Sequence, residues 1–196
     1  MSNLTDKDPL FNLLYQKSFR QSETPIYKLT SGATSRFYID CKNVSLNAEG
    51  AFLIGEAIFK KIESLPVDGV GGMTLGADPI ATAVSLISFI KKKAIPAFIV
   101  RKEPKTHGSA RQVEGTLPVG AKLVVVEDVV TTAGSTLRTI NVLRAEGYTV
   151  LKVVALIDRL EGGGEKITAE GIPFEPLYTM NDFIKELDKV DDQPLN

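Results

Sequence analysis

The stretch from Lys122 to Arg144 places a strand, a loop and a helix in direct succession. Its apolar run Leu123–Val126 is rich in β-branched residues, which is typical of a strand buried on both faces. Two acids, Glu127 and Asp128, follow the run, and Thr131–Thr136 is rich in small and hydroxyl-bearing residues. Apolar residues then recur at roughly helical spacing. The stretch therefore predicts a strand–loop–helix unit with polar chemistry where the strand ends.

The loop of this unit is suited to bind a phosphate. Free backbone N–H groups, hydroxyl donors and the positive end of a helix dipole meet at such a helix N-terminus. Glu127 and Asp128 would repel a phosphate unless they accept hydrogen bonds from sugar hydroxyls or face a metal that the phosphate also holds. A sugar phosphate is the simplest ligand that suits both the loop and the two acids. Alternatively, the two acids merely end the strand and cap the helix.

Strand and helix patterns alternate from residue 67 onward. Strands are predicted at Val67–Val70, Ala97–Val100 and Leu151–Ile157, and a largely apolar helix is predicted from Pro79 to Ile90. This alternation favours an α/β fold in which a parallel sheet carries helices on both faces. Ligands of such sheets bind at the carboxyl ends of the strands, where the loops described below are expected.

Smaller elements are predicted near the two ends of the chain. They are a helix that begins at Asp8 and Pro9, a helix capped by Asn47, a strand at Pro173–Tyr178 and a helix from about Asn181. Residues 25–29 and 36–40 have strand composition and flank a polar loop, so we expect a hairpin or a paired strand with a polar loop.

The composition excludes several classes of protein. The 196 residues carry 23 basic and 24 acidic side chains and a net charge of -1, so no global field favours nucleic acid or a membrane surface. The longest apolar run is far short of the ~20 residues that span a bilayer. The single cysteine, Cys41, excludes an internal disulfide and is interpreted as a packing residue. We expect one domain in the cytoplasm, with no signal peptide.

The segment Arg101–Gly115 is about fifteen residues long and lacks an apolar pattern, which in a compact domain is typical of a mobile lid. A lid that brings cations over a polyphosphate stabilises a leaving diphosphate and excludes water. The alternative is an ordinary solvated loop. The segment contains Arg101, Lys102, Lys105, Arg111 and the only histidine, His107.

Two further loops follow predicted strands. Gly71–Asp78 is glycine-rich and allows a diphosphate to approach the backbone closely, but it lacks the spacing of the dinucleotide fingerprint. The chain also has no P-loop motif, so P-loop nucleotide hydrolysis and Rossmann dehydrogenation are disfavoured. Asp158 and Arg159 end another strand, where the guanidinium offers a bidentate fork to a planar carboxylate. A surface ion pair is the alternative interpretation of these two residues.

Three segments resemble one known family. Val125–Ser135 (VVEDVVTTAGS) resembles the phosphoribosyl-diphosphate motif of type I phosphoribosyltransferases. Arg101–Gly108 (RKEPKTHG) and Leu29–Lys42 (LTSGATSRFYIDCK) resemble the catalytic lid and the N-terminal acceptor-side segment of the orotate phosphoribosyltransferases. The resemblance extends from about Leu10 to Gly164 and implies the type I phosphoribosyltransferase fold. This fold would have a central parallel sheet flanked by helices in a single domain, with residues 1–45 and 165–196 contributing a small hood.

The resemblance also implies an activity and its residues. The reaction would transfer the ribosyl 5-phosphate of 5-phosphoribosyl 1-diphosphate to orotate, giving orotidine 5-phosphate and diphosphate in pyrimidine biosynthesis. Lys105 and Asp128 would be catalytic, and Thr131 and Arg159 would contact orotate. The residues expected to bind the phosphoribosyl donor are Arg101, Lys102, Lys105, His107, Glu127, Asp128, Val129, Val130, Thr131, Thr132, Ala133, Gly134 and Ser135.

Cofactor and partner expectations follow from the same resemblance. Magnesium would arrive chelated mainly by the substrate, with few or no direct protein ligands. The family forms homodimers with shared active sites, so Lys102 would reach into the site of the partner subunit. A transferase acting on a purine or uracil, or a non-catalytic regulator that senses the donor or binds RNA, are the alternatives.

The chain departs from its relatives at three places. Some relatives have lysine in place of Thr30, and Lys28 is the candidate replacement. Others carry a Tyr-Lys pair at Leu75-Gly76. The phosphate loop has Ala133 where glycine is also common, and an alanine predicts an ordinary backbone angle at that point.

Overall fold

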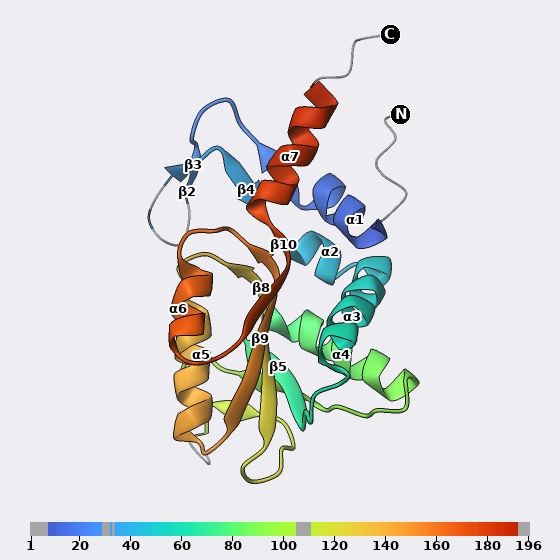
Figure 1. Cartoon of the computed structure of the whole chain (residues 1–196), viewed down its shortest axis with the longest axis vertical. Helices are drawn as coiled ribbons and strands as arrows, with labels where there is room; N and C mark the ends of the chain where they lie inside the picture. Colours follow the sequence, from blue (N-terminus) through green and yellow to red (C-terminus); the bar gives the residue numbers. More distant parts are fainter. Residues whose placement is uncertain (1–7, 29–31, 33, 105–110, 192–196) are drawn as a thin grey trace.

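A six-stranded, mostly parallel sheet forms the centre of the computed structural model, which describes residues 8–28, 32, 34–104 and 111–191 (Figure 1). The strands, in spatial order, are β10 (Phe174–Thr179), β9 (Thr149–Asp158), β8 (Lys122–Val130), β5 (Gly69–Met73), β6 (Ala97–Val100) and β7 (Val113–Glu114). Only the pairing of β6 with β7 is antiparallel. The alternation of strands and helices therefore correctly predicted a central parallel sheet.

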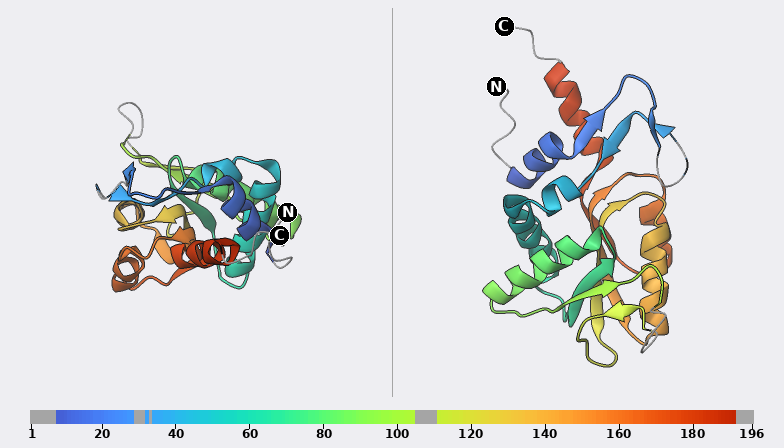
Figure 2. Two further views of the ribbon diagram at one scale, coloured as in Figure 1. Left: turned by 90° about the horizontal axis from the view of Figure 1, so that it is seen from above. Right: turned by 180° about the vertical axis from the view of Figure 1, so that it is seen from behind.

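Helices cover both faces of this sheet, and each face has its own apolar core (Figures 1 and 2). One face carries α3 (Ala48–Ile62) and α4 (Ala77–Ile90), and the other carries α5 (Gly134–Ala145) and α6 (Gly163–Ala169). Side chains of β8 alternate between the cores: Val124 and Val126 belong to the first, Leu123 and Val125 to the second. The continuous apolar run of this strand is explained by burial on both sides.

A smaller group of elements lies beyond the carboxyl ends of the strands (Figure 1). It contains α1 (Pro9–Lys17), β1 (Phe19–Gln21), β2 (Tyr27–Lys28), β3 (Thr34–Ser35), β4 (Phe37–Ile39), α2 (Lys42–Ser45) and α7 (Met180–Asp191). An aromatic cluster joins α7 to the N-terminal elements, because the Phe183 ring centroid lies 4.9 Å from that of Phe11 and 5.4 Å from that of Phe19. Within 165–196, β10 belongs to the central sheet, and the hood of residues 1–45 and 165–196 stays a prediction.

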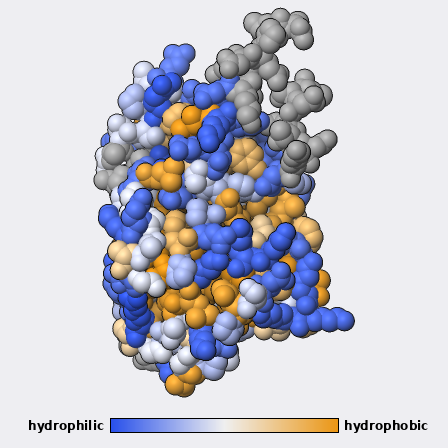
Figure 3. Space-filling model, viewed as in Figure 1, coloured by the Kyte–Doolittle hydropathy of each residue, from blue (hydrophilic) through white to orange (hydrophobic). Residues whose placement is uncertain are grey.

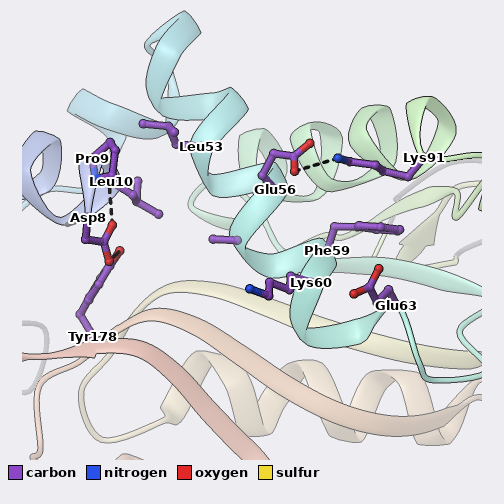
Figure 4. A pocket seen from close by; sticks show the side chains of 11 residues that line it. Asp8, Pro9, Leu10, Leu53, Glu56, Phe59, Lys60, Glu63, Lys91 and Tyr178 are labelled. Carbon is purple, nitrogen blue, oxygen red and sulfur yellow. Dashed lines mark hydrogen bonds and ion pairs between the residues drawn. The ribbon is translucent and has the colours of Figure 1, made fainter. Parts of the chain in front are cut away.

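Asp8 connects the start of α1 to the sheet. Its Oδ1 accepts hydrogen bonds from the backbone N–H groups of Leu10 and Phe11, as an N-cap does, and its Oδ2 accepts one from the Tyr178 hydroxyl at 2.8 Å. Asp8 and Tyr178 border a groove of about 420 Å³ against α3, in which Glu56 pairs with Lys91 at 3.1 Å (Figure 4). The N-cap predicted at Asp8 is confirmed.

The face of the molecule seen in Figure 3 carries both polar and apolar side chains. Charged and polar side chains cover much of the face in Figure 3, with apolar residues between them. None of the helices in the described part of the chain has both the length and the apolar composition that crossing a bilayer requires.

Three sequence predictions were wrong in detail. Residues 37–39 pair with β1, whereas β2 pairs with β3, so the expected hairpin between 25–29 and 36–40 does not form. Gly71–Met73 belongs to β5 rather than to a loop, and α4 begins at Ala77 instead of Pro79. The helix α6 was missed because three consecutive glycines precede and open it.

Phe183→Ala is expected to lower the free energy of unfolding by about 3–5 kcal/mol, because it opens a cavity at a fully buried ring in the aromatic cluster. Equilibrium urea denaturation at fixed protein concentration measures the change. The matched control is Phe52→Ala on α3, whose side chain is 55% exposed and whose loss is expected to cost at most about 0.5 kcal/mol. Equal losses in the two variants would contradict the importance of the cluster.

Candidate functional site

A cavity of about 300 Å³ opens at the carboxyl end of β8, where ligands of parallel sheets bind. Its walls come from the N-terminal strands, from β8 and its following loop, and from the end of β9. The lining residues are Lys28, Tyr38, Ile39, Asp40, Lys42, Glu127, Asp128, Val129, Thr131, Ser135 and Arg159.

Two adjacent acids, Glu127 and Asp128, lie near the carboxyl end of β8, where Val129 and Val130 complete the strand. Glu127 is 5% exposed, and its Oε2 accepts hydrogen bonds from the hydroxyls of Ser135 (2.9 Å) and Thr136 (3.2 Å) on α5. The Oδ1 of Asp128 accepts a hydrogen bond from the N–H of Val129 at 2.8 Å. Both acids line the cavity.

The carboxyl group of Glu127 resists ionisation. Burial, followed by the negative charge of Asp128, raises its pKa from 4.5 to about 8, although hydrogen bonds from Ser135 and Thr136 oppose the shift. Two neighbouring acids thus share less than two full negative charges at neutral pH. Holding such a pair side by side costs less electrostatic free energy than holding two full charges. Its oxygens can still accept hydrogen bonds from neutral hydroxyl groups.

The loop after β8 brings hydroxyl groups and backbone to the helix N-terminus of α5. Thr131 and Ser135 line the cavity, and α5 begins at Gly134, an exposed residue. Ala133 precedes it in the left-handed region at φ 63° and is 2% exposed, so the prediction of an ordinary backbone angle was wrong. The left-handed region costs an alanine roughly 1–2 kcal/mol, which the packing around this loop must offset.

The other predicted members of the loop differ in what they offer. Val130 is 1% exposed, so it contributes packing, and its carbonyl accepts a hydrogen bond from the N–H of Arg159 at 2.9 Å. Val129 lines the cavity and packs against the core on the α3 side. Thr132 is half-buried, and its carbonyl accepts a hydrogen bond from Lys166 at 3.4 Å. Their place in a donor site remains a proposal.

Arg159 supplies a cation on the far side of the cavity from α5. The side chain is only 8% exposed, its Nε donates to Glu161 at 2.8 Å, and one terminal nitrogen donates to the Ser35 hydroxyl at 3.3 Å. These contacts fix the guanidinium between β3 and the end of β9. The surface ion pair considered for Asp158 and Arg159 does not form, because Arg159 pairs with Glu161 instead.

The described part of the lid lies outside this cavity. Arg101 pairs with Glu114 at 3.6 Å, and Arg101 and Lys102 line a separate hollow of about 540 Å³ beside Thr74 and Asp78. Lys105 and His107 lie outside the described residues. The structure therefore brings Glu127, Asp128, Thr131, Ser135 and Arg159 together, but not Arg101 or Lys102 with them.

Several cavity residues were not singled out from the sequence. Tyr38, Asp40 and Lys42 come from a segment whose strand-like pattern gave no chemical signal, although it carries the family resemblance. Cys41 is fully buried between two of them, which agrees with its interpretation as a packing residue, and burial raises its pKa well above the ordinary value. Lys28, the candidate replacement for a lysine at Thr30, does line the cavity.

Known proteins match this chain over most of its length. The model of the phosphoribosyl transferase domain matches residues 50–187. The orotate phosphoribosyltransferase of Aquifex aeolicus is 41% identical over 92% of this chain and 99% of its own length, and that of Sorangium cellulosum is 45% identical over 93% and 95%.

The solved structures give the same result. The orotate phosphoribosyltransferase of Mycobacterium tuberculosis, in complex with 5-phospho-α-D-ribosyl 1-diphosphate, superimposes with a TM-score of 0.72 at 31% identity. The match covers 89% of this chain and 96% of that structure. The chain therefore belongs to the phosphoribosyl transferase domain family and, within it, to the orotate phosphoribosyltransferases.

Proposed function

We propose that this protein transfers the ribosyl 5-phosphate group from 5-phosphoribosyl 1-diphosphate to orotate, forming orotidine 5-phosphate and diphosphate in UMP biosynthesis. The observation that carries the proposal is the shared cavity, which joins an acid pair and a helix N-terminus to a buried arginine. The first two features suit a sugar phosphate, and the third suits an anionic acceptor. The relative bound to the donor at 31% identity supports the same assignment.

The donor half is assigned to the unit of β8 and α5. Glu127 and Asp128 would accept hydrogen bonds from the ribose hydroxyls, and the segment Thr131–Ser135 would hold the 5-phosphate at the N-terminus of α5. The acids also lie where positive charge develops on the sugar as the diphosphate departs, so they favour an oxocarbenium-like transition state.

The acceptor half is assigned to Arg159 and its surroundings. The guanidinium is held by Glu161 and Ser35, which orients it before a ligand arrives and lowers the entropic cost of binding the carboxylate of orotate. Thr131 lies on the same cavity and would contact the acceptor beside it.

The departing diphosphate requires cations. Lys105 and His107 would supply them from the lid, together with Arg101 and with Lys102 of the partner subunit. Among the described residues, no group of three or more His, Cys, Asp or Glu side chains is arranged to hold a metal. Magnesium would arrive chelated mainly by the substrate. Bound magnesium would neutralise charge on the leaving diphosphate.

A homodimer with Lys102 acting in trans is supported by the surface beside that residue. Leu86 and Phe89 on α4 are 61% and 71% exposed and border an apolar hollow of about 460 Å³ that reaches Ala97 on β6. The hollow that contains Lys102 borders the same helix and strand, through Asp78 and Ile99. A second copy packed on this face would bury the apolar side chains and receive Lys102.

We also propose a cytoplasmic location, in keeping with the single free cysteine.

The direct test follows orotate consumption by absorbance, with and without the donor and magnesium. Consumption that requires both is expected, and the same assay with adenine, hypoxanthine and uracil should give no turnover. Turnover with another base alone would contradict the assignment of the acceptor.

Lys105→Ala should lower kcat by roughly 10²–10³, as the loss of one preorganised electrostatic group does. An unchanged single-turnover rate would exclude that role for Lys105.

Sharing of active sites predicts complementation between two inactive variants. Lys102→Ala and Asp128→Asn would each inactivate the homodimer, but a hybrid dimer contains one site with both native residues. Mixing the variants should therefore restore up to roughly a quarter of wild-type activity at statistical exchange, given trans action of Lys102. Exchange is verified with differently tagged subunits. Hybrids without activity would contradict action in trans.

The raised pKa of Glu127 predicts the pH dependence of stability in the ligand-free protein. Its folded-state pKa of about 8 exceeds the ordinary 4.5, so its stabilising contribution is complete below about pH 4.5 and is lost as pH rises through 8. Relative to Glu127→Gln, the wild-type free energy of unfolding should fall by on the order of a few kcal/mol between pH 5 and 8. Urea denaturation across this range measures the difference, with the exposed Glu23→Gln as control. Parallel pH profiles for wild type and Glu127→Gln would contradict the shift.

A further inference from the structure

Gln112 is a half-buried residue to which the proposed function gives no role. It directly precedes β7, and its hydrogen-bond partners Arg101 and Lys102 directly follow β6. The antiparallel pairing of β6 with β7 joins two pairs of residues. A ladder this short holds its ends weakly, so the contacts just beyond it decide how firmly Arg101 and Lys102 are placed.

The side-chain amide of Gln112 donates to two consecutive backbone carbonyl groups. Its Nε2 lies 2.9 Å from the carbonyl oxygen of Arg101 and 3.3 Å from that of Lys102. A glutamine amide has two N–H donors, so one is available for each carbonyl. Turning the amide over would place its oxygen against both carbonyl oxygens, so these two acceptors determine its orientation. One side chain therefore holds two successive residues of the backbone.

The backbone of Gln112 contributes two further hydrogen bonds. Its carbonyl accepts one from the N–H of Arg101 at 2.9 Å, and its N–H donates one to the Oε1 of Glu146 at 3.1 Å. Glu146 is the C-cap residue of α5, and the side chains of Ile140 and Leu143 anchor that helix in the core as fully buried residues. Gln112 thus connects the end of β6 to a packed helix.

The ion pair beside Gln112 is a weaker constraint. Arg101 and Glu114 lie 3.6 Å apart, and their side chains are 46% and 38% exposed. Ion pairs this exposed contribute little, because solvent screens the charges and two long side chains lose conformational freedom. The Gln112 amide binds main-chain carbonyls instead, so it restricts the path of the backbone from which the Lys102 side chain extends.

We propose that Gln112 is a positioning residue for the transfer reaction: through the carbonyls of Arg101 and Lys102, it fixes the backbone from which Lys102 reaches the departing diphosphate. The inference rests on the proposed function, since it deepens the role given there to Lys102. A lysine side chain has several rotatable bonds, so a fixed backbone reduces the space that its ammonium group samples and the entropy lost in the transition state. Gln112 itself contacts neither substrate.

The first test compares Gln112→Met, which keeps the length of the side chain but removes both donors, with Gln112→Arg, whose guanidinium again offers N–H donors. Gln112→Met should lower kcat roughly tenfold, as the loss of two neutral hydrogen bonds allows, and leave the KM for orotate within about twofold of wild type. Gln112→Arg should recover most of the loss. The matched control is Gln16→Met, at an exposed glutamine on α1. An equal loss in the control, or no recovery in Gln112→Arg, would overturn the proposal.

Hybrid dimers decide whether Gln112 acts through Lys102. Each site would combine Asp128 of one subunit with Lys102 of the other, so Gln112→Met should impair only the site to which its own chain contributes Lys102. A purified hybrid of Gln112→Met with Asp128→Asn should therefore retain one site with the wild-type kcat. A hybrid of Gln112→Met with Lys102→Ala should retain only one slow site. Equal activity of the two hybrids would overturn the proposal.

A measurement without ligand separates this inference from the proposed function. Amide hydrogen exchange by NMR should be roughly tenfold faster at the Arg101 N–H in Gln112→Met, because the junction with Gln112 opens more often. The Thr74 N–H, which donates to the carbonyl of Val100 on β6, should keep its rate. Unchanged exchange at Arg101 would overturn the positioning role whether or not the protein is active. Faster exchange in the variant, combined with a wild type that does not consume orotate, would instead refute the proposed function.

Discussion

Two carboxyl groups on consecutive residues of a buried strand determine much of what surrounds them. Glu127 and Asp128 line the same cavity, and each carboxyl group accepts hydrogen bonds from partners of its own. The Glu127 carboxyl group accepts hydrogen bonds from two hydroxyls of α5. The turn at Gly76 packs against the Asp128 side chain, and segment 40–42 contacts the Asp128 backbone carbonyl through Cys41. Burial and like charge would make such a pair unfavourable in isolation. The pair persists because three separate parts of the chain supply donors, charge or close packing at one point.

The elements with strong local patterns were predictable from the sequence. The run Leu123–Val126 fits burial on both faces of a sheet, and the caps at Asp8 and Asn47 are local signals that the structure confirms. Pairing among β1 to β4 was not predictable, because each strand has only two or three residues and therefore too little side-chain pattern to specify its partner.

The sequence did not predict whether a given glycine forms a turn or permits close packing. A Cβ at Gly163 would lie 2.4 Å from the carbonyl oxygen of Thr131, so this glycine permits α6 to pack on the loop after β8 and does not mark a turn. Ala133 presents the reverse case: an ordinary residue occupies a left-handed conformation that local preference disfavours. In both places tertiary contacts override the local signal. The acid pair and Arg159 were identified from sequence, whereas Tyr38 and Lys42 join them only through the non-local fold.

One half of the cavity is formed by a continuous stretch of sequence, and the other half is formed by several separate segments. The unit of β8 and α5 is continuous in sequence, and its geometry is set by one central strand with neighbours on both sides. The opposite wall combines the short strands near residues 28–42 with the end of β9, so its shape depends on segments that are far apart in the sequence. Under the proposed function, substitutions in that wall would alter which acceptor is recognised while the central strand continued to hold the same sugar phosphate. Such a fold would let acceptor specificity change without a change in donor chemistry.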